Sequence, residues 1–445
     1  MSSVSSFHGL QTALRGLLAH QRAIDVTGHN IGNSDTVGYS RQSVDLAAAP
    51  SLRIAAGALQ QGGGADLGTG VDVVAYRRIR DGFLDLQYRA QNMALGEQEA
   101  RSRSLDQAEL AFGEPSDTGL SALLGKLWSA WGDVANAPES TAARQAVVDQ
   151  ARIVADAFAR LDGDLAAVAA GAATDVTALT APGGEVDAMA REIAALNAAI
   201  SRAVGAGTQP NDLLDRRDLL LDRLSALARV SVTDLGNGSI SVAFGDAAVA
   251  LVDDTTVTWP QVLTQAAGGR IGALVDVSRA GGVVDTYRAE LSAAARLLAD
   301  GINALHNPGG TGTDFFSYTA GSEASTLAVA VTAAGVRTGT STAPGANDIA
   351  IAIAALRGGA ADSRYQQLVS RVGTETAEAA RAAHSARVLT GSTDDRRQSV
   401  AGVSLDEEMA ALVRFQRGYQ ASARAMSTLD EMLDTLINRT GRVGL

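Results

Sequence analysis

The two ends of this chain carry matching apolar stripes at helical spacing. Near the N-terminus, six of the eight positions spaced alternately three and four apart from residue 7 to residue 31 are apolar. Near the C-terminus, eight of the ten such positions from residue 405 to residue 437 are apolar. A stripe with this spacing is the seam along which one helix packs against another. The sequence therefore predicts that the two ends of the chain pair as helical rods.

Both seams are predicted to serve assembly. On the N-terminal helix, expected over residues 6 to 32, the assembly residues are Phe7, Leu10, Leu14, Leu17, Ile24 and Ile31. On the C-terminal helix, expected over 404 to 440, they are Leu405, Met409, Leu412, Phe415, Tyr419, Ala423, Met426, Leu433 and Ile437. At 1.5 Å per residue these rods would be roughly 40 Å and roughly 55 Å long. Because two helices cover only part of each other, neighbouring molecules are expected to cover the remaining faces.

Local signals predict where the rods begin and end. Ser404 followed by Glu407 has the spacing of a capping box, which predicts the start of the C-terminal helix. The N-terminal helix is predicted to end in "NIGNSDTVGYSRQ" (30–42), where Asn30 and Asn33 tolerate left-handed backbone and Gly38 opens a turn.

The composition excludes several classes of function. The formal net charge of −12 argues against a nucleic-acid-binding surface, which needs clustered Lys and Arg. Without cysteine there are no disulfides, and the five scattered histidines have no zinc-site spacing. No uninterrupted apolar run reaches the roughly 18 residues of a membrane span, and no leader pattern is recognised at the N-terminus. We therefore expect no catalytic residues, cofactor, metal, small-molecule substrate or membrane-embedded segment.

The predicted fold class is mainly α with a smaller β part. Residues 1–56 and 400–445 are expected to form the terminal coiled coil. Residues 57–228 and 286–399 are expected to form an elongated helical bundle, with an irregular or β insert near 307–360 and a final helix over 361–391. Residues 57–70 are rich in glycine and are predicted to form a loop, and residues 229–285 alternate as in a small β domain.

Three features inside the chain have structural interpretations. Trp128 and Trp131 share one helix face and are expected in the bundle core. His306 ends a predicted helix and is expected to act as a cap residue. The charged residues of the run at 216–223 are predicted to form a solvated helix face with i, i+4 pairs; they are Arg216, Arg217, Asp218, Asp222 and Arg223.

Both ends of the chain resemble a known family. The stretch "NIGNSDTVGYSRQ" and the C-terminal "GVSLDEEMAALVRFQRGYQASARAMSTLDEMLDTLIN" resemble the terminal signatures of the rod, hook and hook-associated axial proteins of the bacterial flagellum. Two stretches resemble the hook-associated members of this family in particular: "LVRFQRGYQASARAM" near the C-terminus and the internal "NDLLDRRDLLLDRLSAL" (211–227). Val37 stands where proline is common, and neither this change nor Gly32 removes the turn. The residues that match the family turn are Asn30, Asn33, Thr36, Gly38, Tyr39, Arg41 and Gln42.

The resemblance implies a structural subunit of the flagellum. Its terminal helices would line the central channel, and a ring of copies would join hook to filament. The implied partners are other copies, the hook protein, a second hook-associated junction protein, an export chaperone and the flagellar type III export apparatus. The implied location is extracellular, in the flagellum, after export from the cytoplasm without a cleaved signal peptide.

Two other functions are consistent with parts of the pattern. A hook or distal-rod protein shares the turn, but hook proteins are mostly β. A cytoplasmic coiled-coil adaptor would use the same seams to bind a partner, and its terminal helices would be protected from hydrogen exchange in the free monomer.

Overall fold

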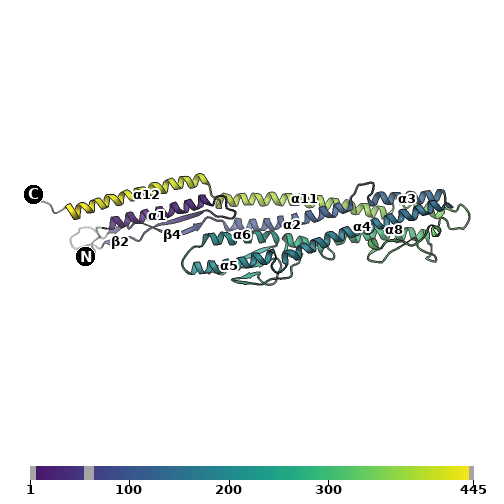
Figure 1. Ribbon diagram of the computed structural model, residues 1–445, viewed down its shortest axis with the longest axis horizontal. Coiled ribbons are helices and arrows are strands. Elements are labelled where there is room, and N and C mark those ends of the chain that lie inside the picture. The colour runs from purple at the N-terminus through teal and green to yellow at the C-terminus, as the bar shows by residue number, and fades with distance from the viewer. Residues whose placement is uncertain (1–6, 55–64, 440–445) are drawn as a thin grey trace, which may run out of the picture.

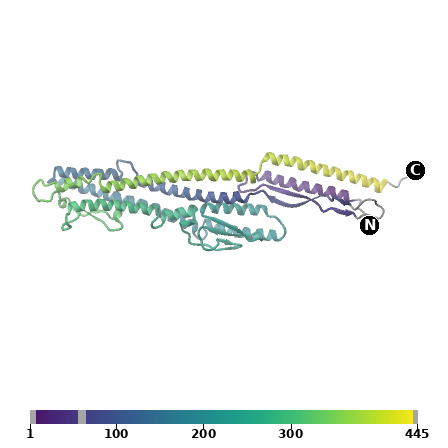
Figure 2. The same ribbon diagram turned by 180° about the vertical axis from the view of Figure 1, so that it is seen from behind.

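The chain forms an elongated molecule that runs out from one tip and returns to it. The structure is a computed structural model, and it describes residues 7–54 and 65–439. The helix nearest the N-terminus and the helix nearest the C-terminus lie side by side at the same tip in both views (Figure 1, Figure 2). The fold is mainly α with small sheets, which confirms the predicted class.

Long α-helices make up most of the molecule. They are α1 (His8–Gly32), α2 (Gly82–Phe112), α3 (Leu120–Asn136), α4 (Thr141–Thr180), α5 (Glu185–Gly205), α6 (Asn211–Leu227), α7 (Gly269–Ser278), α8 (Val283–His306), α9 (Glu323–Thr326), α10 (Asp348–Ala354), α11 (Ala360–Ala401) and α12 (Leu405–Asp434). Short 3-10 helices are η1 (Gln265–Ala267) and η2 (Ala333–Gly335), and a π-helical stretch, η3 (Thr435–Arg439), follows α12.

The strands form antiparallel sheets of two or four strands. They are β1 (Gln42–Ala48), β2 (Leu52–Ile54), β3 (Ala65–Leu67), β4 (Val71–Arg78), β5 (Val230–Asp234), β6 (Ile240–Phe244), β7 (Val252–Asp253), β8 (Thr256–Val257), β9 (Phe316–Ser317) and β10 (Ala328–Val329). In the described residues β1 pairs with β4, β2 with β3, and β9 with β10, while β5–β6–β7–β8 form the four-stranded sheet. The β1–β4 pair runs beside α1 (Figure 1).

The terminal helices α1 and α12 form an antiparallel hairpin. Gly9 faces Leu429 and Gly16 faces Ser422, so residues of rising number in α1 meet residues of falling number in α12. A Cβ atom on Gly418 would lie 2.6 Å from the His20 ring, which makes the backbone of α12 part of this contact. Small residues therefore let the two helices approach closely.

The helical bundle holds one continuous hydrophobic core. Helix α11 packs along α2, and α4 packs against α3, α7 and α8. Trp128 and Trp131 are buried in this core, as predicted, and the Nε1 atom of Trp128 donates to Asp362. The buried core cluster extends from residue 100 to residue 379 and contains no residue of α1 or α12. The terminal hairpin therefore stands outside the core.

Several sequence predictions differ from the structure. Helix α11 continues to Ala401 instead of ending at 391, because the stretch after 391 contains no proline and its Thr393 is buried. The β region predicted to 285 ends earlier, since β8 ends at Val257 and "GRIGALVDVS" forms α7, which packs on α2 and α4. Most of the predicted glycine-rich loop at 57–70 lies outside the described residues.

His306 also differs from its predicted role. It does end α8, but its side chain is buried and its Nε2 accepts a hydrogen bond from the backbone N–H of Arg337 at 3.0 Å. Burial lowers the pKa of His306, and the neighbouring charge of Arg337 lowers it further. The ring therefore fastens the loop that carries Arg337 to the end of α8.

One stretch meets a length-and-composition test for a membrane span. It covers residues 141–205, which include α4 and α5, and its most apolar 18-residue window has a mean hydropathy of 1.3. A single window of this kind is weak evidence for a span, because alanine raises the hydropathy of bundle helices as well.

Candidate functional site

The terminal hairpin joins the bundle at a polar region that we call the neck. The neck comprises residues 29–42, 76–92, 211–223 and 394–408. Its turn crosses α6 at Gly38, where φ is +83° and an added Cβ would lie 3.2 Å from the Leu219 side chain. The turn therefore requires glycine at this position, both for its backbone conformation and for its close approach to α6.

Asn30 connects several elements in the part of the neck next to the terminal hairpin. Its side chain is 1% exposed, and its Oδ1 accepts from the hydroxyl of Tyr39 at 2.7 Å and from the backbone N–H of Gln42 at 2.9 Å. Its Nδ2 donates to the carbonyl of Gln42 and to Glu408 of α12. One amide thus joins α1, the turn, β1 and α12. Asn30 lies inside α1, and Asn33 has φ of −112°, so the expected left-handed backbone is absent from both.

Arg41 connects the turn to the start of α12. Its Nε donates to Glu408 and its Nη1 donates to Glu407, each at 2.7 Å. Burial opposes the charged form, but the two glutamates outweigh it and raise the pKa of Arg41. The predicted helix start is confirmed, because Ser404 is the N-cap residue of α12. The hydrogen bonds of the predicted capping box are wrong, because Ser404 makes no side-chain cap hydrogen bond and Glu407 accepts from Arg41 instead.

An acidic face of α6 forms the other side of the neck. Asp215 accepts from the backbone N–H of Ser40 at 2.9 Å and from its hydroxyl at 2.7 Å. Asp218 pairs with Arg78 at 2.9 Å and with Arg80 at 3.1 Å. These contacts attach the turn and the end of β4 to α6.

The acidic face continues towards the bundle at Asp222. Its carboxylate accepts from Arg89 of α2 and from Arg397 of α11. The guanidinium of Arg397 also lies over the ring of Tyr88, 3.9 Å from the ring centre. Three helices therefore meet around one buried carboxylate.

The predicted solvated face at 216–223 is wrong for three of its five residues. Arg217 and Asp222 are buried and Asp218 is largely buried, and their partners come from other elements. Arg216 and Arg223 are exposed. A pattern in the sequence could have indicated that this face is buried against arginines. Acids at 212, 215, 218 and 222 recur at spacings of three and four on one face, opposite the arginines of "YRRIRDGFLDLQYR".

Acid is expected to weaken the neck through Asp218. Burial alone would raise the pKa of Asp218, but Arg80 and Arg78 outweigh it and hold the pKa below its usual range. A carboxyl with a depressed folded pKa stabilises the fold above its unfolded pKa of about 3.9, and this contribution is lost as the pH falls further. In denaturant unfolding at a series of pH values, the free energy of unfolding should therefore fall below about pH 4.

Two substitutions separate this effect from general acid unfolding. Asp218→Asn should flatten the pH dependence below about pH 4, whereas Asp149→Asn, at an exposed pair with Arg152, should leave it unchanged. Equal pH profiles for Asp218→Asn and the unaltered chain would contradict the assignment.

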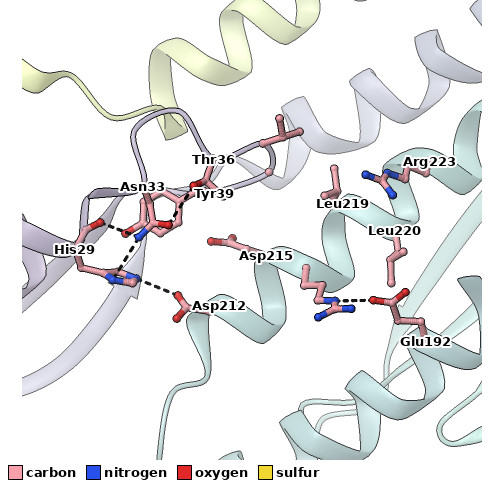
Figure 3. A pocket seen from close by; sticks show the side chains of 13 residues that line it. His29, Asn33, Thr36, Tyr39, Glu192, Asp212, Asp215, Leu219, Leu220 and Arg223 are labelled. Atoms are coloured by element: carbon pink, nitrogen blue, oxygen red, sulfur yellow. Dashed lines mark hydrogen bonds and ion pairs between the residues drawn. The ribbon is translucent and has the colours of Figure 1, made fainter. Parts of the chain in front are cut away.

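A cavity of about 510 Å³ opens between the turn, α5 and α6 (Figure 3). Val37, Gly38, Leu219 and Leu220 contribute its apolar wall. Its polar rim is formed by His29, Asn33, Thr36, Tyr39, Glu192, Asp212, Asp215, Arg216 and Arg223. His29 lies 3.4 Å from Asp212, and Arg216 pairs with Glu192, so the rim is partly ordered by its own contacts (Figure 3).

The structure brings the two predicted seams together, but it buries smaller residues than predicted. The buried residues of α1 are Ala19, Ala23, Thr27 and Asn30, and the one buried residue of α12 is Glu408. The predicted seam residues that are half-buried are Leu10, Leu17, Ile24, Ile31, Leu412, Phe415, Tyr419, Ala423, Met426 and Leu433. Those that are exposed are Phe7, Leu14, Leu405, Met409 and Ile437. The hairpin therefore presents large apolar side chains outwards.

The remaining residues of the turn support one another. Thr36 donates through its hydroxyl to Asn33 Oδ1 at 3.1 Å, and Asn33 Nδ2 donates to the carbonyl of His29 at 3.0 Å. Gln42 donates to Asp212 and accepts from Asn211, both of α6. Within residues 7–54 and 65–439, no group of three or more His, Asp or Glu side chains is placed to hold a metal ion.

Comparisons with known proteins agree with this architecture. The family described as "Flagellar hook-associated protein FlgK helical domain" matches residues 105–267. The C-terminal family of flagellar basal body rod FlgEFG proteins matches 397–439, and the flagella basal body rod protein family matches 10–39. Flagellar hook-associated protein 1 of Bacillus subtilis is 28% identical, and the match covers 98% of this chain and 99% of that protein.

The chain belongs to the flagellar hook-associated protein 1 family.

Other members of this family match over shorter stretches. The Salmonella typhimurium protein of the same name is 31% identical over 68% of this chain, and the match spans 58% of its own length. A solved structure, "The structure of the flagellar hook junction protein FlgK from Burkholderia pseudomallei", is 22% identical with a TM-score of 0.46, and the match covers 53% of this chain and 47% of that one. As a hook-associated protein, the chain is an axial structural component of the bacterial flagellum.

Proposed function

We propose that this chain is the subunit of a ring that joins hook to filament, and that its copies associate through their terminal hairpins. The observation that carries the proposal is the outward exposure of large apolar side chains on both hairpin helices. Leu14 and Leu18 on α1, and Leu405, Met409 and Val413 on α12, are exposed in the single chain. Exposed apolar stripes on a rod outside the core gain free energy when a second rod covers them.

The partners proposed for the chain follow from this position in the axis. They are further copies of the chain, the hook protein and a second hook-associated junction protein. Before assembly, we propose that an export chaperone covers the C-terminal seam and that the flagellar type III export apparatus exports the chain. No catalytic residue is proposed, and the absence of enzyme activity stays a prediction.

Two structural features argue against the other functions considered. The described residues are mostly helical, whereas a hook protein would be mostly β. The exposed hairpin stripes argue against a monomeric adaptor whose seams are already covered. Hydrogen exchange on the purified monomer tests the second point, because the proposal expects faster exchange in α1 and α12 than in the bundle.

Removal of residues 404–445 is expected to abolish assembly while the bundle still folds. The truncation removes α12, but the core cluster lies between residues 100 and 379 and keeps its contacts. Circular dichroism of the truncated chain should show a cooperative helical transition. Immunodetection in isolated flagella should show none of it at the junction.

A paired control isolates the role of the exposed stripe from the loss of a whole helix. Leu14→Gln with Met409→Gln should reduce incorporation into flagella. Val388→Gln with Leu389→Gln, on exposed sites of α11, should not. A truncated chain that still forms hook-filament junctions would refute the proposed function.

A further inference from the structure

Two surface features of the neck have no role in the contacts described so far. One is an exposed apolar pair at the start of α2, formed by Phe83 and Leu86, which we call the knob. The other is the 510 Å³ cavity between the turn, α5 and α6. Both belong to the neck, because Arg80 and Asp85 beside the knob take part in the same charge network as Asp218 beside the cavity.

The knob is well exposed and is rigidly held. Phe83 is 72% exposed and Leu86 is 62% exposed, and their spacing of three residues places them next to each other on α2. Asp81 caps this helix by accepting from the backbone N–H groups of Phe83 and Leu84. The start of α2 is therefore ordered although Phe83 and Leu86 face solvent.

The knob points away from α6. Phe83 lies nine residues before Asn92, which is half a turn around the helix at 100° per residue. The amide of Asn92 donates to the carbonyl of Asp222 and to the hydroxyl of Ser225, so that side of α2 faces α6. The cavity is formed by α6, α5 and the turn. Knob and cavity therefore use different surfaces of one molecule.

The cavity has the size and lining to receive the knob. Sites that bury small ligands commonly measure roughly 300–1,000 Å³, so about 510 Å³ can hold a phenylalanine and a leucine side chain together. Its wall includes Leu219, Leu220 and Val37. Contact would remove the apolar wall of the cavity and the apolar side chains of the knob from water, which is favourable.

The charges beside the two surfaces are complementary. Arg223 on the cavity rim is exposed and makes no hydrogen bond or ion pair with any described residue. The side chain of Asp81 beside the knob makes only its cap hydrogen bonds and has no ion pair within the described residues. An unpaired cation next to the cavity and an unpaired anion next to the knob favour their association.

We propose that the knob of one copy inserts into the neck cavity of the adjacent copy, with Asp81 of the first beside Arg223 of the second. Such a contact joins two different surfaces, so it repeats from copy to copy and closes into a ring when the rotation allows. This inference rests on the proposed ring and names its lateral contact. The hairpins hold the copies of the ring together near its axis, and the knob adds a second contact between the same neighbours.

Disulfide trapping in assembled flagella tests the contact. The chain has no cysteine, so only introduced thiols can react. A chain carrying Leu86→Cys and Val37→Cys, in cells that lack the unaltered protein, should give a ladder of oligomers when isolated flagella are oxidised and run without reductant. The matched control carries Val388→Cys and Val37→Cys and should give monomer, because Val388 is similarly exposed but lies on α11. Adding Phe83→Asp to the first pair should reduce the ladder about tenfold or more.

The outcomes separate this contact from the proposed function. A double-cysteine chain that is present in flagella but gives no ladder would overturn the knob contact and leave the ring standing. Equal ladders from both cysteine pairs, or a ladder that Phe83→Asp does not change, would also overturn it. Absence of even the cysteine-free chain from isolated flagella would overturn the proposed function itself. A loss of incorporation with Leu86→Cys that the Val388→Cys control does not share supports the contact, because position 86 is exposed in the single chain.

Discussion

Asp222→Ala is expected to lower the free energy of unfolding by about 3–5 kcal/mol, which is typical when one partner of a buried ion pair is removed. The substitution leaves Arg89 and Arg397 facing each other without the carboxylate that both contact. Arg89 would keep only Asp218 and Arg397 only Asp394 as close carboxylate partners, so each guanidinium would keep the cost of its burial with weaker compensation. Urea unfolding followed by circular dichroism measures the loss. Hydrogen exchange should show the earliest opening where α2, α6 and α11 meet.

An exposed ion pair provides the matched control for this experiment. Asp149 and Arg152 lie 3.3 Å apart on α4, with side chains 54% and 56% exposed. Pairs of this kind contribute about 0.2–1 kcal/mol at most, so Asp149→Ala should change stability little. If Asp222→Ala were no more destabilising than Asp149→Ala, the neck would not depend on its buried charges.

Trp131→Ala is expected to lower the free energy of unfolding by about 3–5 kcal/mol. The loss should be largest in the half of the bundle that is far from the terminal hairpin. The indole is fully buried, and its ring centre lies 5.2 Å from that of Phe315. Its removal creates a cavity where α3 packs against the neighbouring core, and helices of this length cannot close such a space completely. The measurement is the shift in the urea midpoint, with hydrogen exchange to show that α3 and α4 are affected first.

Two further substitutions show whether volume or polarity causes the loss. Trp131→Phe should cost less than about 1.5 kcal/mol, because most of the ring volume remains. The Nε1 atom of Trp131 is buried without a hydrogen-bond partner among the described residues, so its removal costs no bond seen there. Leu110→Ala, at a side chain that is 80% exposed, should have almost no effect. Equal losses from Trp131→Ala and Leu110→Ala would contradict the buried position of this tryptophan.

Long periodic patterns in the sequence predicted the large elements well. The stripes at both ends became α1 and α12, and the stretches "NAPES" and "APGG", which carry the turn-forming residues proline and glycine, separate bundle helices. These features depend on local chemistry, which a single segment contains in full. The break expected after residue 391 failed because packing on α2 overrides the weak turn preference of "GSTDD" there.

The neck was harder to predict, because its contacts join segments far apart in the sequence. The acids of α6 meet arginines from β4, α2 and α11, and no local pattern says that these elements converge. Asn30 looked like a helix-ending residue, since asparagine favours turns, but its amide satisfies four partners while it remains helical. The family resemblance located the turn correctly without revealing why those side chains occur in it.

The seams show a similar limit. Periodicity identified which helices would pair, but it could not show which side of each stripe faces the partner within one chain. Glycine and alanine occupy the intramolecular contact and leave several leucines and methionines outside it. Hydrophobicity alone favours the large side chains, whereas close approach of two backbones favours the small ones. The residues available to neighbouring copies followed from the structure.

The placement of both described chain ends at one tip has a consequence for how such a molecule can diversify. The opposite tip, where α3 and α8 lie, is reached only by the middle of the chain (Figure 1). Residues added there, for example in the loop between α9 and α10, would lengthen the far tip without altering the register of α1 against α12. A domain or epitope inserted at that point is therefore compatible with an unchanged terminal hairpin. The far tip is the part of the molecule where an added domain would disturb the hairpin least.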